Sequence, residues 1–234
     1  VAPAWAAPHF ELGPNFRGGG LPRGVRYCRD FISPVEEERL MQVLDVDRKH
    51  WLGHLKSRAQ QFFGLVYYQT SHELPALQPT GDAQQGRPMG DLPPWLMSRI
   101  LDTEVFRGAD EINQVAANEY VRNMGISNHV ENVTCFGANL ATLSLLDPVY
   151  IHLTPDEEPM AVGRDHGNWV KILLEPRSLF VLQDESRYAY KHGIRRSKLV
   201  PLPDGQTLRR DEGFRRVSLT FRELLETRRM LVDL

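Results

Sequence analysis

The sequence predicts an α+β fold in which a double-stranded β-helix (a double-sheet jelly roll) carries amino-terminal helices packed on one sheet. Two observations predict this fold. Helix signals are confined to the first half of the chain, and short alternating stretches follow one another from residue 113 onward. Two helices followed by many short antiparallel strands are typical of such an α+β domain. We expect a flexible or covering arm over residues 1–24, and one domain over residues 25–234 with its jelly-roll core over residues 113–222.

The composition is that of an ordinary globular protein, and it excludes several classes. Of 234 residues, 41% are hydrophobic and 25% are charged, which allows a sizeable core. The net charge is −2 and the pI is about 6.5, so the chain as a whole has no electrostatic preference for nucleic acid. Two cysteines without C-x-x-C spacing do not indicate a zinc ribbon. The sequence shows neither a signal peptide nor an apolar run of about 20 residues, so we expect an intracellular protein, cytoplasmic or nuclear.

The amino-terminal half predicts two helices with a strand between them. Ser33 can cap the first helix and Pro34 occupies its first position, both of which favour a helix start. Pro94, beside another proline, begins the second helix. Residues 58–70 combine aromatic and β-branched side chains and predict a strand. With the Pro- and Gly-containing loop that follows, the 58–92 region is expected to form a lid over the substrate.

The carboxyl-terminal half predicts short strands separated by turns. The expected strands are 114–120, 128–131, 138–145, 149–153, 170–174, 179–183 and 216–222. The two faces of the last strand differ, because Val217, Leu219 and Phe221 alternate with Arg216, Ser218, Thr220 and Arg222. If the polar face points inward, its two guanidinium groups suit a dicarboxylate; if it points outward, they are simply solvated. Asn118 and Tyr120, also two residues apart, could add an amide and a phenol to the same site.

The first candidate for a metal site is His129-Val130-Glu131. Residues two apart on a strand face the same side, so an imidazole and a carboxylate would converge. One distant histidine would complete the two-His-one-carboxylate triad that leaves open positions on non-haem Fe(II). His152, His166 and His192 are candidates for it, and spacing alone does not select among them.

Four segments, in this order, resemble the AlkB branch of Fe(II)- and 2-oxoglutarate-dependent dioxygenases: NEY, GISNHVE, ESRYAYKHGI and RVSLTFR. Upstream, RDFISPVEEERL resembles the entry helix of that family and SRAQQFFGLVYY its substrate-side strand. Within the family, RYAYKHGI and the serine of RVSLTFR look most similar to the branch that hydroxylates a modified wobble uridine in tRNA.

The resemblance implies Fe(II), 2-oxoglutarate and O2 as cofactors, and it implies roles for particular residues. The implied iron ligands are His129, Glu131 and His192. The implied cosubstrate site consists of Asn118, Tyr120, Arg216, Ser218 and Arg222, with Arg216 on the distal carboxylate. Glu131 stands where the family has Asp, so the carboxylate is one methylene longer.

The substrate side is expected to lie beneath the 58–92 region. Aromatic residues there could stack on a base presented out of its stack, and cations could contact phosphate. The candidates are Phe62, Phe63, Tyr67, Tyr68, Arg58 and Arg87. The alternative is that they are core residues and solvated surface charges.

Three functions stand in order of preference. The first is hydroxylation or demethylation of a modified nucleic acid, for which we favour RNA or tRNA. The second is oxidation of a small molecule, such as an amino acid or a specialised metabolite, by the same machinery. The near-neutral charge, Glu131, and Val133, which offers no carboxylate to a base, favour this second function. The third is a binding protein that has lost turnover.

Overall fold

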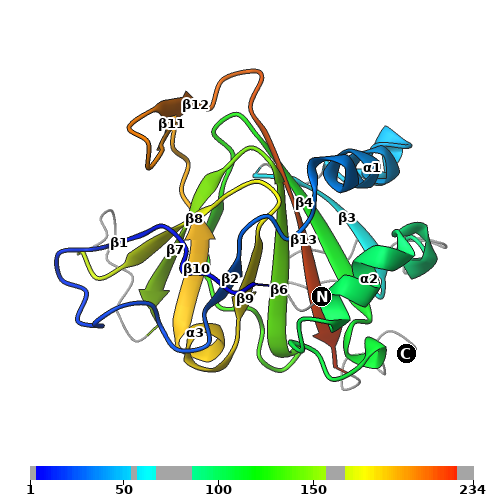
Figure 1. The fold of residues 1–234 in the computed structure, drawn as a ribbon, viewed down its shortest axis with the longest axis horizontal. Helices are drawn as coiled ribbons and strands as arrows, with labels where there is room; N and C mark the ends of the chain where they lie inside the picture. The colour runs from blue at the N-terminus through cyan, green and yellow to red at the C-terminus, as the bar shows by residue number, and fades with distance from the viewer. Residues whose placement is uncertain (1–3, 54–56, 67–85, 157–166, 226–234) are drawn as a thin grey trace, which may run out of the picture.

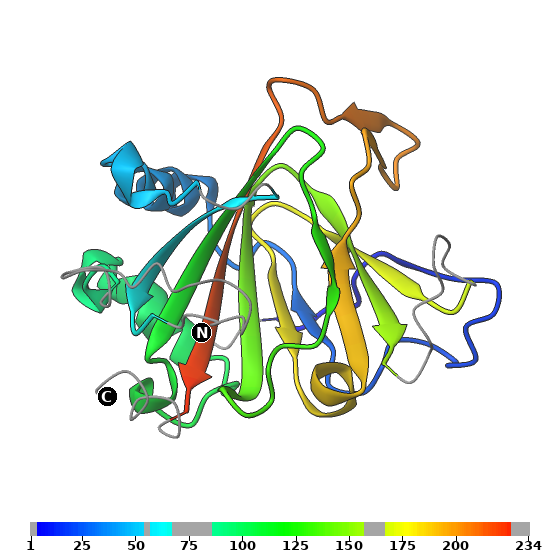
Figure 2. The ribbon, with the colours of Figure 1, turned by 180° about the vertical axis from the view of Figure 1, so that it is seen from behind.

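The structure, a computed structural model, describes residues 4–53, 57–66, 86–156 and 167–225. Two antiparallel sheets face one another, and two helices lie outside one of them (Figures 1 and 2). The strands are β1 Phe10–Leu12, β2 Arg26–Cys28, β3 Ala59–Gly64, β4 Gln114–Val121, β5 Ile126–His129, β6 Phe136–Leu146, β7 Val149–Pro155, β8 Val170–Leu174, β9 Leu179–Leu182, β10 Tyr190–Ile194, β11 Leu199–Pro201, β12 Thr207–Arg209 and β13 Arg215–Leu224. The helices are α1 Pro34–Leu44, α2 Pro94–Leu101 and α3 Asp184–Tyr188, and short 3-10 turns lie at Arg48–His50, Met89–Asp91 and Ala109–Glu111.

The strand order is that of a double-sheet jelly roll, which confirms the predicted fold class. Six strands form the major sheet in the order β2-β9-β6-β13-β4-β3. Five strands form the minor sheet in the order β1-β8-β7-β10-β5. Strands β11 and β12 form a separate hairpin, which stands at the top of Figure 1 away from the helices. Most neighbours in the two sheets are not consecutive strands of the chain, the exceptions being β3–β4 and β7–β8, and such crossing connections are typical of a jelly roll.

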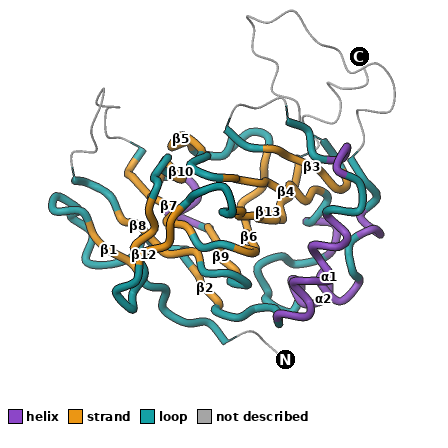
Figure 3. Tube along the Cα trace, turned by 90° about the horizontal axis from the view of Figure 1, so that it is seen from above, coloured by secondary structure: helices purple, strands orange, loops and turns teal. Residues whose placement is uncertain are grey.

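Helix α1 starts where the sequence predicts it. The Ser33 hydroxyl accepts a hydrogen bond from the Glu36 amide at 3.3 Å, and the Glu36 carboxylate accepts one from the Ser33 amide at 2.7 Å. This reciprocal capping box satisfies two amides that a helix start leaves without partners. Helices α1 and α2 lie side by side beyond the major sheet, on the side opposite the minor sheet (Figure 3).

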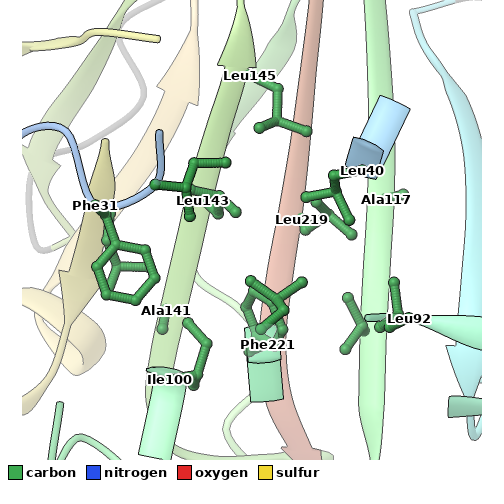
Figure 4. Packing of buried hydrophobic residues seen from close by; sticks show 14 of the residues in the cluster. Phe31, Leu40, Leu92, Ile100, Ala117, Ala141, Leu143, Leu145, Leu219 and Phe221 are labelled. Atoms are coloured by element: carbon green, nitrogen blue, oxygen red, sulfur yellow. The ribbon is translucent and has the colours of Figure 1, made fainter. Parts of the chain in front are cut away.

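The largest apolar cluster packs these helices against the major sheet, as Figure 4 shows for Leu40, Ile100 and Leu219 among others. Leu219 and Phe221 of β13 are fully buried in this cluster. Because successive residues of a strand point to opposite faces, the polar face of β13 must point toward the minor sheet. The structure therefore selects the inward orientation of the two arginines.

A second apolar cluster lies between the sheets. It includes Tyr120 and Leu140 from the major sheet, with Ile151, Leu153 and Ile172 from the minor sheet. Arg216 and Arg222 of β13 consequently point into a largely apolar interior, where a guanidinium needs hydrogen-bonding partners or a bound anion.

Four local expectations change. The strand expected over residues 128–131 is β5, which ends at His129, so Glu131 lies in the loop behind it. The HGI segment, which was not among the expected strands, is part of strand β10. Within the expected arm, β1 pairs with β8 at the edge of the minor sheet. The strand expected over 58–70 ends at Gly64, and residues 67–85 lie outside the described part of the chain.

Candidate metal and cosubstrate site

Two neighbouring strands of the minor sheet bring two histidines together. His129 ends β5 and lies directly opposite His192 in β10, with ring centroids 4.5 Å apart. Glu131 follows two residues after His129. One potential ligand atom from each of the three side chains lies within 4.8 Å of the other two. We call His129, Glu131 and His192 the triad.

The donor set of the triad fits a divalent iron ion. Two imidazole nitrogens and one carboxylate oxygen form the arrangement that non-haem Fe(II) enzymes use. His129 Nδ1 lies 2.8 Å from the Ser127 carbonyl oxygen. When Nδ1 carries the proton and donates it to that carbonyl, Nε2 keeps its lone pair for a metal.

Burial and neighbouring charges keep Glu131 and His192 in their metal-binding protonation states. Burial raises the pKa of Glu131, but the positive charge of Arg222, together with the nearby imidazoles and Arg187, outweighs burial, so the net shift of this pKa is downward. Burial, with the neighbouring His129, lowers the pKa of His192 to about 3. At neutral pH the carboxylate is therefore charged and the His192 imidazole is neutral, as metal ligation requires.

Arg222 holds one oxygen of the Glu131 carboxylate. Its Nη1 donates to Glu131 Oε1 at 2.9 Å, while its Nε donates to Gln114 Oε1 at 2.6 Å. The guanidinium also lies 3.9 Å from the centre of the Phe136 ring. With one oxygen engaged, the geometry leaves Oε2 as the oxygen that a metal would take.

Arg216 lies toward the other end of β13 on the same inward face. It is 1% exposed, and its two terminal nitrogens donate to Ser218 Oγ at 3.2 Å and Ser144 Oγ at 3.3 Å. Among the described residues, its Nε finds no hydrogen-bond partner. Burial lowers the pKa of Arg216 to about 10, so it remains cationic at neutral pH. A buried cation with an unused donor is suited to an anionic ligand.

Strand β4 places the expected amide and phenol beside this arginine. Tyr120 pairs with Arg216 and Asn118 pairs with Ser218, so all four belong to the inward face. Asn118 Oδ1 accepts from Arg58 Nε at 3.0 Å and from Gln60 Nε2 at 2.7 Å. These two bonds fix the orientation of the amide.

The structure thus brings the predicted metal and cosubstrate residues together between the two sheets, all on inward strand faces except Glu131, which lies in the loop after β5. It adds residues that the sequence argument missed, namely Gln60, Gln114, Ser144 and Arg187. A signal existed for Ser144, a polar residue between two leucines in β6. Gln60 is adjacent to Gln61 in β3, and Gln114 follows Asn113 at the start of β4, so neither alternates with apolar residues. Arg187 lies in a short helix and carried no such signal.

The predicted substrate residues divide between the two faces of β3. Arg58 and Phe62 lie on the inward side, where Phe62 is half-buried opposite Ala116. Phe63 is fully buried in the helix-side core. Arg87 lies over its ring and bonds to Asp91 and Gln61, so neither of these two residues reaches the triad. Tyr67 and Tyr68 fall outside the described residues.

The structure also separates the three candidate histidines. His152 pairs with Lys171 and Gly193 and lies on the face of the minor sheet that points away from the triad. Its ring lies edge-on to Trp169, with centroids 6.0 Å apart. His166 lies outside the described residues.

A jelly roll that carries two imidazoles on neighbouring strands and a carboxylate in the loop after one of them defines the class of non-haem iron oxygenases. The chain belongs to the 2OG-Fe(II) oxygenase superfamily, whose family model matches residues 24–222. It is therefore a dioxygenase that uses Fe(II), 2-oxoglutarate and O2, as the sequence predicted. No helix in the described part of the chain has the length and apolar character needed to cross a membrane.

Similar proteins are AlkB homologues, which confirms the predicted branch of the superfamily. The chain is 28% identical over 218 residues to the "Alkylated DNA repair protein ALKBH8 homolog" of Arabidopsis thaliana, covering 86% of this chain and 58% of that protein. It is 26% identical to the Xenopus tropicalis "tRNA (carboxymethyluridine(34)-5-O)-methyltransferase alkbh8", over 80% of this chain but only 28% of that protein. It is 29% identical to the Danio rerio "Probable RNA/DNA demethylase ALKBH6", covering 74% and 70% of the two chains.

The fold is also found in a solved structure. "The structure of OsALKBH1" superposes with a TM-score of 0.57 at 16% identity, covering 87% of this chain and all of that one. At this identity the match speaks for the fold alone.

Proposed function

We propose that the triad holds Fe(II) and that the enzyme hydroxylates a modified uridine at the wobble position of tRNA. The proposed substrate is supported by the similarity, over 80% of this chain, to a protein named for carboxymethyluridine at position 34 of tRNA. The triad supports the iron site, because its ligand atoms lie within 4.8 Å of one another. Hydroxylation follows from the oxygenase class.

In this proposal 2-oxoglutarate lies along the inward face of β13. Arg216 binds its distal carboxylate through the Nε that has no partner among the described residues, and Ser218 and Tyr120 line the same end. Asn118 offers its amide nitrogen, since its oxygen is engaged by Arg58 and Gln60. The keto-acid end then lies toward the triad, near Arg222.

When bound, Fe(II) and 2-oxoglutarate together supply the oxidising power that inserts an oxygen atom of O2 into a C–H bond. The residues of this chain hold and orient these groups. Arg222 keeps the Glu131 carboxylate charged and turned to one side. The apolar residues between the sheets exclude water from the reacting atoms.

Phe62 of β3 and Arg58, which directly precedes this strand, support binding of a base. Phe62 lies half-buried on the inward face and offers a ring on which a base could stack. Arg58 lies on the same side of the edge strand and contacts Asn118. Tyr67 and Tyr68, which follow this strand, stay predictions of the same kind.

A small molecule is the second candidate substrate, and the net charge of −2 favours it. Proteins that bind nucleic acid mainly through phosphates carry an excess of positive charge. Among small molecules, an amino acid or a specialised metabolite is the class that we propose.

The test measures succinate formation with Fe(II), ascorbate and 2-oxoglutarate, in the presence of bulk tRNA, of free amino acids, or of neither. We expect stimulation by tRNA, and mass spectrometry of its nucleosides should show a uridine derivative heavier by one oxygen atom. Stimulation by amino acids alone would move the enzyme to the small-molecule candidate.

A pair of histidine variants tests the iron site itself. Mn(II) serves as a stable substitute for Fe(II). We expect His192→Ala to abolish both Mn(II) binding and turnover. His152→Ala, which changes a buried histidine on the opposite face of the minor sheet, should leave Mn(II) binding unchanged. The reverse result would reject the proposed ligands.

A further inference from the structure

Arg187 is a buried cation in helix α3, and the chemistry proposed above does not use it. It is 2% exposed. Its Nη1 donates to the backbone carbonyl of Glu131 at 2.9 Å, and its Nε and Nη2 donate to the carbonyls of Gly137 and Phe136, each at 3.3 Å. One planar guanidinium thus contacts three carbonyl oxygens, all from the segment that leads from β5 into β6.

The position of Arg187 in the chain connects two parts of the triad. Helix α3 is separated from strand β10 by Ala189 alone, so Arg187 precedes His192 by five residues. The segment that it contacts begins at Glu131. Figures 1 and 2 show α3 at the lower end of the two sheets, beside β10 and β6.

Other hydrogen bonds of this loop are mostly local to it. The Asn132 carbonyl accepts from the amides of Cys135 and Phe136, and the Asn132 side chain accepts from Thr134. These bonds shape the loop, but they do not set its distance from β10. The contact from Arg187 to Glu131 links the loop to helix α3, which runs directly into the strand that carries His192.

We propose that Arg187 is a positioning residue that sets where Glu131 lies relative to His192, and so tunes the affinity of the metal site. This inference rests on the proposed iron site. Arginine suits the role because its rigid fork of donors satisfies several carbonyls at once, whereas a lysine ammonium is a point charge on a flexible stem. Groups behind the ligands of a metal commonly change its affinity by about 10- to 100-fold when they are removed.

Arg210 provides a matched control for the loss of a buried arginine. It is 5% exposed, and it also donates to two backbone carbonyls, those of Arg195 and Met124. Met124 precedes β5 and Arg195 follows β10, so both carbonyls lie at the strand ends opposite to those that Arg187 connects. Neither carbonyl belongs to a residue of the triad or to a direct neighbour of one. Its removal should lower stability by a similar mechanism without displacing Glu131.

The experiment titrates Mn(II) into wild-type protein, Arg187→Met, Arg187→Lys and Arg210→Met, and records the Co(II) absorption spectrum of each. We expect Arg187→Met to weaken Mn(II) binding by about tenfold or more and to alter the Co(II) spectrum. Arg187→Lys should fall between that variant and the wild type. Arg210→Met should keep the wild-type affinity and spectrum, although both Met variants lower the denaturation midpoint.

Two results would overturn the inference: wild-type affinity and spectrum in Arg187→Met, or an equal loss of affinity in Arg210→Met. If either Met variant fails to fold, Arg187→Lys and Arg210→Lys carry the same comparison. Failure of the wild-type protein to bind Mn(II) would instead reject the proposed iron site. The two failures are therefore distinguishable.

Discussion

Adjacent arginines on β13 have opposite environments. Arg216 faces the interior and contacts Ser218 and Ser144. Arg215 faces the helices, where it forms ion pairs with Asp45 at 2.7 Å and Glu119 at 2.8 Å. The alternation of the strand thus assigns a ligand-binding role to one guanidinium and a structural role to its neighbour.

This contrast predicts different kinetic effects for the two arginines. Arg216→Lys should raise the KM for 2-oxoglutarate by about 10- to 100-fold, because a lysine lacks the rigid planar fork that aims Nε at the carboxylate while the terminal nitrogens bond to Ser218 and Ser144. Arg215→Lys should leave that KM within about twofold. Succinate formation measured against 2-oxoglutarate concentration checks both. An unchanged KM in Arg216→Lys would place the distal carboxylate elsewhere.

His152 shows how burial and neighbouring cations shift the pKa of a histidine. Burial, with the nearby charges of Arg195 and Lys171, lowers the pKa of His152 to about 3 from its ordinary value of 6.5. Between these two values the unfolded chain binds a proton at this residue that the folded protein does not bind. The free energy of unfolding must therefore rise with pH across that window and fall as the solution becomes more acidic.

We predict that His152→Gln flattens this dependence. Inside this pH window, one such histidine raises the free energy of unfolding by up to about 1.4 kcal/mol for each pH unit. The variant should lose part of the slope between about pH 4 and pH 6, while His192, whose pKa is also lowered to about 3, keeps its own contribution. Urea unfolding at several pH values with a chelator present measures the slope. A slope equal to that of the wild type would contradict the prediction.

At the scale of elements, the clearest sequence signals were those with a short-range physical cause. The capping residues of α1 and the alternation of β13 are set by neighbours in sequence, and both elements form as predicted. Strand β10 was not among the predicted strands, and it contains Gly193, a residue type that usually weakens a strand. In the fold, Gly193 lies against the backbone and side chain of Asn128, where a Cβ atom would clash.

The sequence could not predict which face of the edge strand β3 points toward the site. Phe62 and Phe63 are adjacent aromatics that must point to opposite sides of β3. Only the packing of the helices decides that Phe63 is the buried one. For the same reason Arg87 could not be excluded from the site, since its contacts with Asp91 and Phe63 arise from tertiary structure.

The capping box of α1 predicts a separable loss of stability. Ser33→Ala removes the hydroxyl that accepts from the Glu36 amide and should cost about 1 kcal/mol. Because α1 lies on the outer side of the major sheet, Mn(II) affinity should not change (Figure 1). Ser98→Ala, which changes an exposed serine within α2, should change stability by less than about 0.5 kcal/mol. Urea unfolding and Mn(II) titration check both, and equal losses of stability would rule out a specific cap.

At the scale of the whole molecule, charge is the property that separates the two candidate substrates. The chain carries 28 Lys and Arg against 30 Asp and Glu, so it has no general attraction for a polyanion. Several of its arginines are also committed to internal contacts, among them Arg187, Arg210, Arg215, Arg216 and Arg222. Any RNA must therefore be held by a small number of phosphate contacts together with base stacking.

A small number of phosphate contacts predicts a measurable dependence on salt. With two or three contacts, kcat/KM for tRNA should fall by about ten- to thirtyfold between about 50 and 200 mM KCl. The KM for 2-oxoglutarate should change far less, because Arg216 binds its carboxylate in a buried site that salt screens weakly. Succinate formation at several salt concentrations, with tRNA and with 2-oxoglutarate varied in turn, separates the two effects. A tRNA-stimulated rate that does not change with KCl concentration would mean that phosphates contribute nothing to binding. The substrate would then have to be a free nucleoside or another small molecule in the tRNA preparation.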